Sequence, residues 1–339
     1  MKPLVITMKM LAKVGTAVLL AGLFIGLASY SSSLTQNHIH LIDTKEDDSR
    51  PQLRYHFALI GEDMNSSFWQ SLKTGAQKAA KSAQAAVEFD GPLVQNEDEE
   101  LRCLSIAIEA NVDGIAVYVP NKTKFRPLIN KAVAKGINVV TIESDDVGSS
   151  RKAYIGPDSY DIGVTQGTLV KEAENGKSNV ALILGGNYAL NSDLSASLLK
   201  GFQDTVRENT EISLQSVQNS SSGYFKAEEI IRDILYQYPS VNTVVCTSES
   251  DTFEIVQVLI DLNKIKGMTV IGYSSSAQIR DYIRNSVIFG SAYENPEETG
   301  SQCIGCLTNL FNKKSVPSVI KTSVSSITKN NLITYSGGS

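Results

Sequence analysis

Residues 86–122 read AVEFDGPLVQNEDEELRCLSIAIEANVDGIAVYVPNK. They contain an extended segment, a DGP turn, an acidic amphipathic helix and an apolar strand that ends at Pro120. Acidic residues favour a helix N-terminus because they complement the helix dipole. A strand that is apolar at nearly every position is typical of a sheet buried on both faces. The stretch therefore predicts a β-α-β unit of a parallel sheet covered by helices.

The same unit recurs along the chain. Short apolar strands alternate with amphipathic helices from Tyr55 onward, and a second series of the same kind starts near Pro157. The predicted fold is α/β, with two doubly wound parallel-sheet lobes. Each sheet would open a ligand crevice at the carboxyl ends of its strands. If the two crevices face each other, they form one cleft that suits a small polar ligand and closes around it.

The N-terminus carries a targeting signal. Three lysines precede residues 14–30, which are apolar or small and carry no charge. That length lies between a secretory signal core and a minimal membrane span, so residues 1–30 are either a signal peptide or an N-terminal membrane anchor. The preceding lysines favour an extracytoplasmic position for everything after Tyr30. Residues 31–52 are polar and predict a linker.

The composition excludes several classes of protein. A net charge of −5, without clusters of lysine and arginine, argues against a nucleic-acid-binding protein. Four cysteines are too few for a disulfide framework. Cys303 and Cys306 form CIGC on a predicted helix, where a core-facing position is favoured over a redox or metal site. The His38-Ile39-His40 triplet lies in the linker, which supplies no other metal ligand at a fixed position, so a metal site is not expected there.

Enzymatic motifs are missing from the sequence. There is no GxSxG, HExxH, GxGxxG or phosphate-binding GxxxxGK[ST] motif. The loop LGGNYALNS, residues 184–192, is expected to be an ordinary turn between a strand and a helix. Asp145 and Asp146 are expected to be solvated. We therefore predict a binding protein rather than an enzyme, with no cofactor and no metal site.

Several segments in fixed order resemble the type I periplasmic sugar-binding proteins. This ribose/galactose-binding group has the fold of the LacI-like sensing domain. The segments are FALIGEDMNSSFWQSLKTGAQKAA (57–80), YIGPDSYDIGVTQG (154–167) and MTVIGYSSSAQIRDYIRNSVIFGSAYENPEETG (268–300). FDGP (89–92) is most similar to the branch of rhamnose and autoinducer-2 binding proteins. A LacI-like repressor needs an N-terminal helix-turn-helix, and an apolar segment stands there instead.

The resemblance implies a three-segment hinge between the lobes, with crossings near Pro157, Tyr293 and Ser323. The N-terminal lobe would comprise residues 53–157 and 294–322. The C-terminal lobe would comprise residues 158–293 and 323–339.

The resemblance also implies aromatic ligand contacts. Phe68 and Trp69 match the aromatic pair that follows the first strand, where flat rings stack on the apolar faces of a sugar. The alternative is that one of them caps the helix and packs in the core. If Trp69 contacts the ligand, Trp69→Ala should weaken binding without unfolding the protein.

The polar ligand contacts implied by the resemblance depart from the family pattern. Arginines of the family are replaced, so a ribose-like hydrogen-bond network is not expected. Carboxylates near the cleft mouth, including Glu62 and Asp63, disfavour anionic ligands and leave room for a cationic one. The alternative is that these carboxylates are solvated at the rim of the cleft and do not contact a ligand. The expected polar and aromatic contacts are Glu143, Ser144, Ser248, Glu249, Tyr273, Ser274, Tyr293 and Glu294.

The prediction is an extracytoplasmic solute-binding protein, at the cell surface or in the periplasm. It would close on a sugar or sugar-like molecule and present the closed form to a membrane partner. That partner is either a sensor histidine kinase or an ABC permease. The alternative is a ligand-less interaction module of the same fold that docks a membrane receptor.

Overall fold

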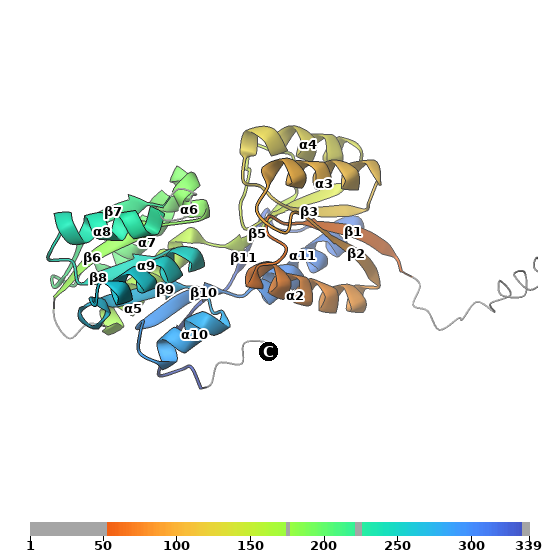
Figure 1. Cartoon of the computed structure of the whole chain (residues 1–339). Coiled ribbons are helices and arrows are strands. Elements are labelled where there is room, and N and C mark those ends of the chain that lie inside the picture. The colour runs from red at the N-terminus through yellow and green to blue at the C-terminus, as the bar shows by residue number, and fades with distance from the viewer. Residues whose placement is uncertain (1–52, 174–176, 221–225, 334–339) are drawn as a thin grey trace, which may run out of the picture. The chain divides into compact units, whose positions relative to one another are not determined.

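The computed structural model describes residues 53–173, 177–220 and 226–333 (Figure 1). The predicted signal peptide or anchor and the predicted linker lie outside these residues. Within the described part, none of the helices combines the length and the apolar character needed to cross a membrane.

Five strands from the first half of the chain and one from near its C-terminus build a six-stranded sheet in which every pairing is parallel. In order across the sheet, the strands are β11 (Val319–Thr322), β5 (Ala153–Pro157), β4 (Asn138–Ile142), β3 (Gly114–Tyr118), β1 (Tyr55–Ile60) and β2 (Ala85–Asp90). Helices α3 (Glu97–Glu109) and α4 (Lys122–Ala134) cover one face, and α2 (Ser67–Ala83) and α11 (Pro296–Phe311) cover the other (Figure 1). β3 is buried at every position, as the sequence predicts for a sheet covered on both sides.

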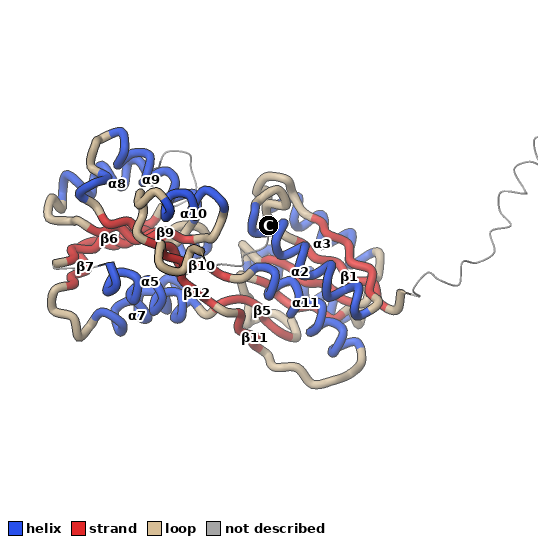
Figure 2. Tube along the Cα trace, turned by 90° about the horizontal axis from the view of Figure 1, so that it is seen from below, coloured by secondary structure: helices blue, strands red, loops and turns tan. Residues whose placement is uncertain are grey.

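The second sheet also has six strands. Their order is β12 (Val324–Thr328), β10 (Gly290–Glu294), β9 (Thr269–Tyr273), β8 (Thr243–Cys246), β6 (Ser178–Leu184) and β7 (Ile212–Asn219). Five strands run parallel, and β12 adds to β10 in the antiparallel direction. Helices α5 (Ser159–Ala173) and α7 (Ser192–Val206) cover one face, and α8 (Lys226–Gln237), α9 (Glu249–Asp261) and α10 (Ala277–Arg284) cover the other (Figure 2).

The predicted fold class is confirmed. The chain passes between the sheets three times: between β5 and α5, between β10 and α11, and between β11 and β12. We keep the lobe boundaries 53–157 with 294–322, and 158–293 with 323–339, as a proposal.

Helix caps fix the loops at the carboxyl ends of the strands. Ser66 accepts a hydrogen bond from Trp69 N and begins α2, and Ser248 accepts one from Asp251 N and begins α9. Asn295 caps α11 in the same way, followed by a proline at the first helical position. Such caps hold a helix start in one place because they satisfy N–H groups that have no partner within the helix. The loops next to the strand ends are therefore well positioned for a site.

The CIGC pair belongs to the core. Cys303 and Cys306 lie on α11, and both are buried free thiols in the cluster between α11, α2 and the first sheet. Burial raises the pKa of Cys306 to about 11, so this thiol stays neutral and unreactive.

Candidate functional site

A cleft of about 1340 Å³ lies at the carboxyl ends of the strands of both sheets. Its lining comes from the loops after β1, β3 and β4 in the first sheet and after β6, β8, β9 and β10 in the second. The volume exceeds the range of about 300–1,000 Å³ that is usual for a small-molecule site. The cleft is thus large enough for a small ligand.

The first sheet contributes an aromatic wall. The ring of Trp69 meets Phe68 edge-on at 5.5 Å and Tyr118 edge-on at 6.1 Å. Trp69 is only 3% exposed, and a Cβ added to Gly61 would lie 2.7 Å from its ring. Phe68 is partly buried against the same core. Both aromatic residues line the cleft, but Trp69 is also a core residue.

The burial of Trp69 changes the expectation for Trp69→Ala. Removing this side chain would open a cavity in the core, and such truncations cost about 3–5 kcal/mol. Contrary to the expectation from the sequence, we expect the alanine variant to lose stability as well as any ligand contact.

Two lining residues, one from each sheet, have a left-handed backbone. Glu143 follows β4 with φ 61°, and Ser274 follows β9 with φ 101°. Residues other than glycine pay about 1–3 kcal/mol for such a conformation, which concentrates at ligand-binding sites. Hydrogen bonds hold both turns: Glu143 N donates to Ile155 O at 3.1 Å, and Ser274 N donates to Ala292 O at 2.8 Å.

The carboxyl groups of Glu143 and Glu294 form a pair in the cleft. Thr299 donates its hydroxyl hydrogen to Glu143 Oε1 at 3.3 Å, and Tyr273 donates its own to Glu294 Oε1. Burial raises the pKa of both glutamates, and the neighbouring Glu294 raises that of Glu143 further. Two adjacent buried carboxylates repel each other, so the pair holds a proton to higher pH than a solvated glutamate does.

A hydrogen bond crosses the cleft from the first sheet to the second. Tyr118, at the end of β3, donates to Asn187 Oδ1 in α6 (Asn187–Leu190). The Tyr118 hydroxyl also lies beside the carboxyl of Glu62, which accepts from Gln95 Nε2 at 2.9 Å. Burial raises the pKa of Glu62 to about 7. Glu62 therefore changes its charge near neutral pH.

The second sheet contributes hydroxyl and carboxyl groups. Ser248 caps α9, and Glu249 begins it. Beneath them, Asp251 is 6% exposed and accepts a hydrogen bond from the Ser220 hydroxyl at 2.6 Å. Burial raises the pKa of Asp251 as well.

Carboxyl groups dominate the charge of the cleft. Among the lining residues in the part of the chain that the structure describes, Arg280 is the one that carries a positive charge. Its Nη1 donates to Ser275 O at 2.6 Å. The acidic lining residues are Glu62, Asp63, Glu143, Glu249, Asp251, Glu254, Glu294 and Glu297. Such a lining disfavours an anionic ligand.

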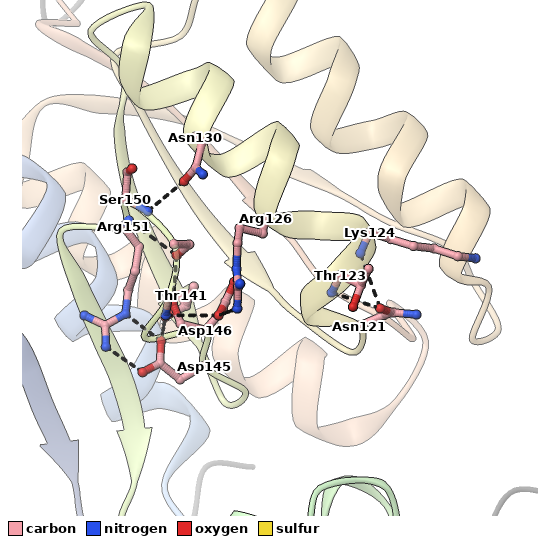
Figure 3. Close-up of polar contacts among 12 residues, drawn as sticks. Asn121, Thr123, Lys124, Arg126, Asn130, Thr141, Asp145, Asp146, Ser150 and Arg151 are labelled. Carbon is pink, nitrogen blue, oxygen red and sulfur yellow. Dashed lines mark hydrogen bonds and ion pairs between the residues drawn. The ribbon is translucent and has the colours of Figure 1, made fainter.

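The loop after β4 is held by ion pairs, and this corrects the expectation that Asp145 and Asp146 are solvated. Arg126 binds Asp146 through two hydrogen bonds of 2.7 and 2.6 Å, and Arg151 binds Asp145 through two of 2.6 and 2.5 Å (Figure 3). The side chain of Asp146 is 1% exposed. Arg151 Nη1 also reaches Ser318 O at 2.8 Å. These paired charges fix the segment that carries Glu143.

Nine of the ten residues expected at the site line the cleft. They are Phe68, Trp69, Glu143, Ser248, Glu249, Tyr273, Ser274, Tyr293 and Glu294. The exception is Ser144, which is 5% exposed and donates its hydroxyl hydrogen to Val119 O at 2.7 Å. Ser144 therefore joins two loops of the first sheet rather than facing the cleft.

Sequence reasoning missed several lining residues. Tyr118 was assigned only to a buried strand, and Asn187 lies in the loop that was expected to be an ordinary turn. Tyr154 and Tyr188 also line the cleft. Tyr154 is the second residue of β5, whereas the other three, Tyr118, Asn187 and Tyr188, lie at or just after the carboxyl end of a strand. The position of a polar or aromatic residue at a strand end was the signal that could have found these three.

No group of three or more His, Cys, Asp and Glu side chains in residues 53–173, 177–220 and 226–333 is arranged to hold a metal ion.

Comparison with known proteins shows which family the chain belongs to. The model of the periplasmic binding protein domain matches residues 57–315. The chain belongs to the periplasmic binding protein family. Membership confirms the predicted family of type I sugar-binding relatives and implies an extracytoplasmic location. It is a family of binding proteins, and no enzyme family is indicated.

Solved periplasmic binding proteins share the two-sheet architecture. A glucose-galactose binding protein, GanP of Geobacillus stearothermophilus, is 31% identical with a TM-score of 0.75, covering 82% of this chain and 98% of its own. XylFII in the XylFII–LytSN complex is 27% identical with a TM-score of 0.69, at 82% and 98% coverage.

One curated relative is the D-allose-binding periplasmic protein of Escherichia coli K12. It is 20% identical over 258 residues, which are 72% of this chain and 81% of that protein. The predicted similarity to the rhamnose and autoinducer-2 branch stays a prediction.

Proposed function

We propose that this chain is an extracytoplasmic receptor that binds a sugar or sugar-like molecule in the cleft and closes on it. The observation that carries the proposal is the cleft itself, with an aromatic wall on the first sheet and hydroxyl and carboxyl groups on the second. Two similar proteins are described as binding glucose and galactose, and D-allose.

The chemistry of the lining supports a polyhydroxylated ligand. Aromatic rings such as Phe68 offer flat apolar surface to the C–H faces of a sugar ring. Carboxylates accept hydrogen bonds from sugar hydroxyls, and the hydroxyls of Ser248 and Ser274 both donate and accept. We assign the nine lining residues named above to ligand binding and leave Ser144 in a supporting role.

The connections between the sheets support closure. Three short connections allow a hinge motion, in which a few residues at element ends change their backbone angles. The bond from Tyr118 to Asn187 already spans the cleft at one point. Ligand groups that contact both walls favour the closed form because they bind it better than the open one.

We further propose that the closed form is recognised by a membrane partner, with the protein tethered by residues 1–30. One candidate partner is a sensor histidine kinase, and the complex that the similar XylFII forms with LytSN supports a protein partner for this chain. An ABC permease is the other candidate, because two of the structural relatives are described as sugar-binding components of ABC transporters.

A thermal-shift panel tests the binding function. Residues 53–339 would be melted with D-glucose, D-galactose, D-allose, D-ribose and D-xylose. A bound ligand at one hundred times its Kd stabilises the folded state by about 2.7 kcal/mol, so the melting temperature rises. Ser248→Ala should reduce the shift, whereas Glu208→Gln, an exposed change at the end of α7, should not. No shift with any sugar would instead favour a ligand-less module that docks a receptor.

A further inference from the structure

We propose that the cleft binds a monosaccharide that carries a protonated amino group, and that this ammonium lies between the carboxyl groups of Glu143 and Glu294. The inference rests on the proposed function and specifies the class of ligand for the same site.

The first support is an unmet hydrogen-bond acceptor. Glu294 Oε1 accepts from Tyr273, and Oε2 is buried without a backbone N–H or a hydroxyl beside it among the described residues. The group beside it is the carboxyl of Glu143, which can donate to Glu294 only while the pair holds a proton. Once that proton is lost, Oε2 is a buried carboxylate oxygen without a donor, so a ligand that brings a donor gains from meeting it. An ammonium brings three donors.

The second support is the position of the pair. Glu143 follows β4 of the first sheet, and Glu294 ends β10 of the second, so the two carboxyl groups come from opposite walls of the cleft. The left-handed backbone of Glu143 is held by hydrogen bonds on both sides, since Glu143 N donates to Ile155 O and Ser144 N donates to Ile142 O. A ligand cation bound between the two carboxyl groups would therefore contact both walls and favour the form in which the walls lie closer together.

The third support is the charge of the surrounding lining. Further carboxyl groups of the cleft lining, such as Glu62 on the first sheet and Glu249 on the second, add negative potential. The one lining cation, Arg280, donates to the carbonyl of Ser275 at the start of α10. A cationic ligand is favoured in this field, and phosphorylated or carboxylated sugars are disfavoured.

The pair makes binding depend on protons. Without ligand, burial and mutual repulsion favour a proton shared by the two carboxyl groups, because both have a raised pKa. When an ammonium enters, it supplies the positive charge that the proton supplied, and the proton is released to solvent. The amine keeps its own proton. Affinity for an amino sugar should therefore rise with pH until the amine itself deprotonates, whereas affinity for a neutral sugar should not rise.

Other titratable groups face the pair from several elements. They are Glu62 after β1, Tyr118 of β3, Tyr154 of β5, Tyr188 of α6, Tyr273 of β9 and Cys303 of α11. Burial raises the pKa of Tyr118, Tyr154, Tyr188 and Cys303, so these groups remain neutral. Glu62, with a pKa of about 7, titrates near neutral pH and would add its own change in bound protons. A Glu62→Gln variant is therefore the control for the proton release.

Calorimetry with paired ligands tests the inference. D-glucosamine and D-galactosamine would be compared with D-glucose and D-galactose, and with N-acetyl-D-glucosamine, in which the amine is neutral. We expect each amino sugar to bind at least tenfold more tightly than its neutral counterpart. Its binding heat should vary with the ionisation enthalpy of the buffer, which reports proton release. Glu62→Gln should keep the larger part of the release, and Glu208→Gln, which lies outside the cleft lining, should change neither the release nor the preference.

Variants of the pair locate the ammonium. Glu143→Gln and Glu294→Gln should each remove at least tenfold of the affinity for the amino sugar and abolish the proton release, with a smaller effect on a neutral sugar. If either variant fails to fold, the pH dependence and proton release of the unchanged protein still decide the matter. Equal or tighter binding of the neutral sugars overturns the inference and leaves the proposed function standing. An amine preference that survives both substitutions also overturns it. Failure of every sugar to bind overturns the proposed function as well.

Discussion

The hydroxyl of Tyr118 in β3 donates a hydrogen bond to Oδ1 of Asn187 in α6, and this bond joins the two walls of the cleft. Tyr118 is 3% exposed, and its ring also meets Trp69 edge-on. One side chain thus links the aromatic core of the first sheet to the loop after β6.

Tyr118→Phe keeps the ring and removes the bond. We expect it to lower the free energy of unfolding by about 0.5–1.5 kcal/mol, the usual net contribution of one hydrogen bond. Urea unfolding followed by circular dichroism measures the change. Tyr236→Phe, at a position that is 87% exposed, is the matched control and should have no effect. A Tyr118→Phe variant as stable as the unchanged protein would mean that the bond contributes nothing.

Trp69 has a role in both the core and the cleft, and two substitutions separate these roles. Trp69→Ala should lower the free energy of unfolding by about 3–5 kcal/mol because it leaves a cavity beside Gly61 and Tyr118. Trp69→Phe retains most of the apolar volume, so it should lose less stability. Chemical denaturation of the two variants, with sugar affinity measured on Trp69→Phe, gives the comparison. Equal stability of both variants would contradict the burial of this side chain.

Glu100, in the first turn of α3, makes stability depend on pH. The residue is 1% exposed, and neither carboxylate oxygen has a hydrogen-bond partner among the described residues. Burial, together with the smaller effects of the Glu62 and Glu97 charges, raises its pKa from 4.5 to about 8. Between these values, the unfolded chain loses the proton while the folded chain keeps it. The free energy of unfolding therefore falls as pH rises from about 4.5 to 8 and then levels off.

Glu100→Gln removes this dependence. We expect the variant to be more stable than the unchanged protein at pH 8.5 by about 2 kcal/mol, with little difference at pH 4.5. Urea titrations across this range provide the measurement. Asp98→Asn is the matched control in the same turn, because its side chain is 91% exposed. If Glu100→Gln had the same pH profile as the unchanged protein, Glu100 would not be a buried acid.

The loop after β4 depends on the ion pair between Arg151 and Asp145. Their side chains are 8% and 17% exposed, and Arg151 also holds the carbonyl of Ser318. Arg151→Ala leaves a largely buried carboxylate without its partner, which should cost about 3 kcal/mol of the free energy of unfolding.

A double-mutant cycle isolates the pair. Arg151→Ala combined with Asp145→Ala should be less destabilising than the sum of the single changes, because the double variant has no unpaired charge. The corresponding cycle on the exposed pair of Lys131 and Glu109 should give well under 1 kcal/mol. Strict additivity at Arg151 and Asp145 would show that the two charges do not stabilise each other.

The sequence by itself determined the order of strands and helices, because hydrophobic periodicity and capping residues act over a few neighbouring positions. β1 begins at Tyr55 and α2 begins after Ser66, where the pattern of apolar residues and the serine cap place them. Two series of such units were sufficient to predict two sheets. The loops at the strand ends followed from the fold, which is why most of the expected site residues line the cleft.

Only the tertiary structure decided the state of the individual side chains. Asp145 and Asp146 look solvated in the sequence, but arginines from α4 and from the start of β5 lie against them. From the sequence, Trp69 could stack on a ligand or pack in the core. In the structure its ring packs against Gly61, and most of its surface is buried in the core. Glu143 and Glu294 become a pair because strands far apart in the chain end at the same cleft. Desolvation and charge coupling depend on every neighbouring group in space, and a local sequence pattern does not contain that information.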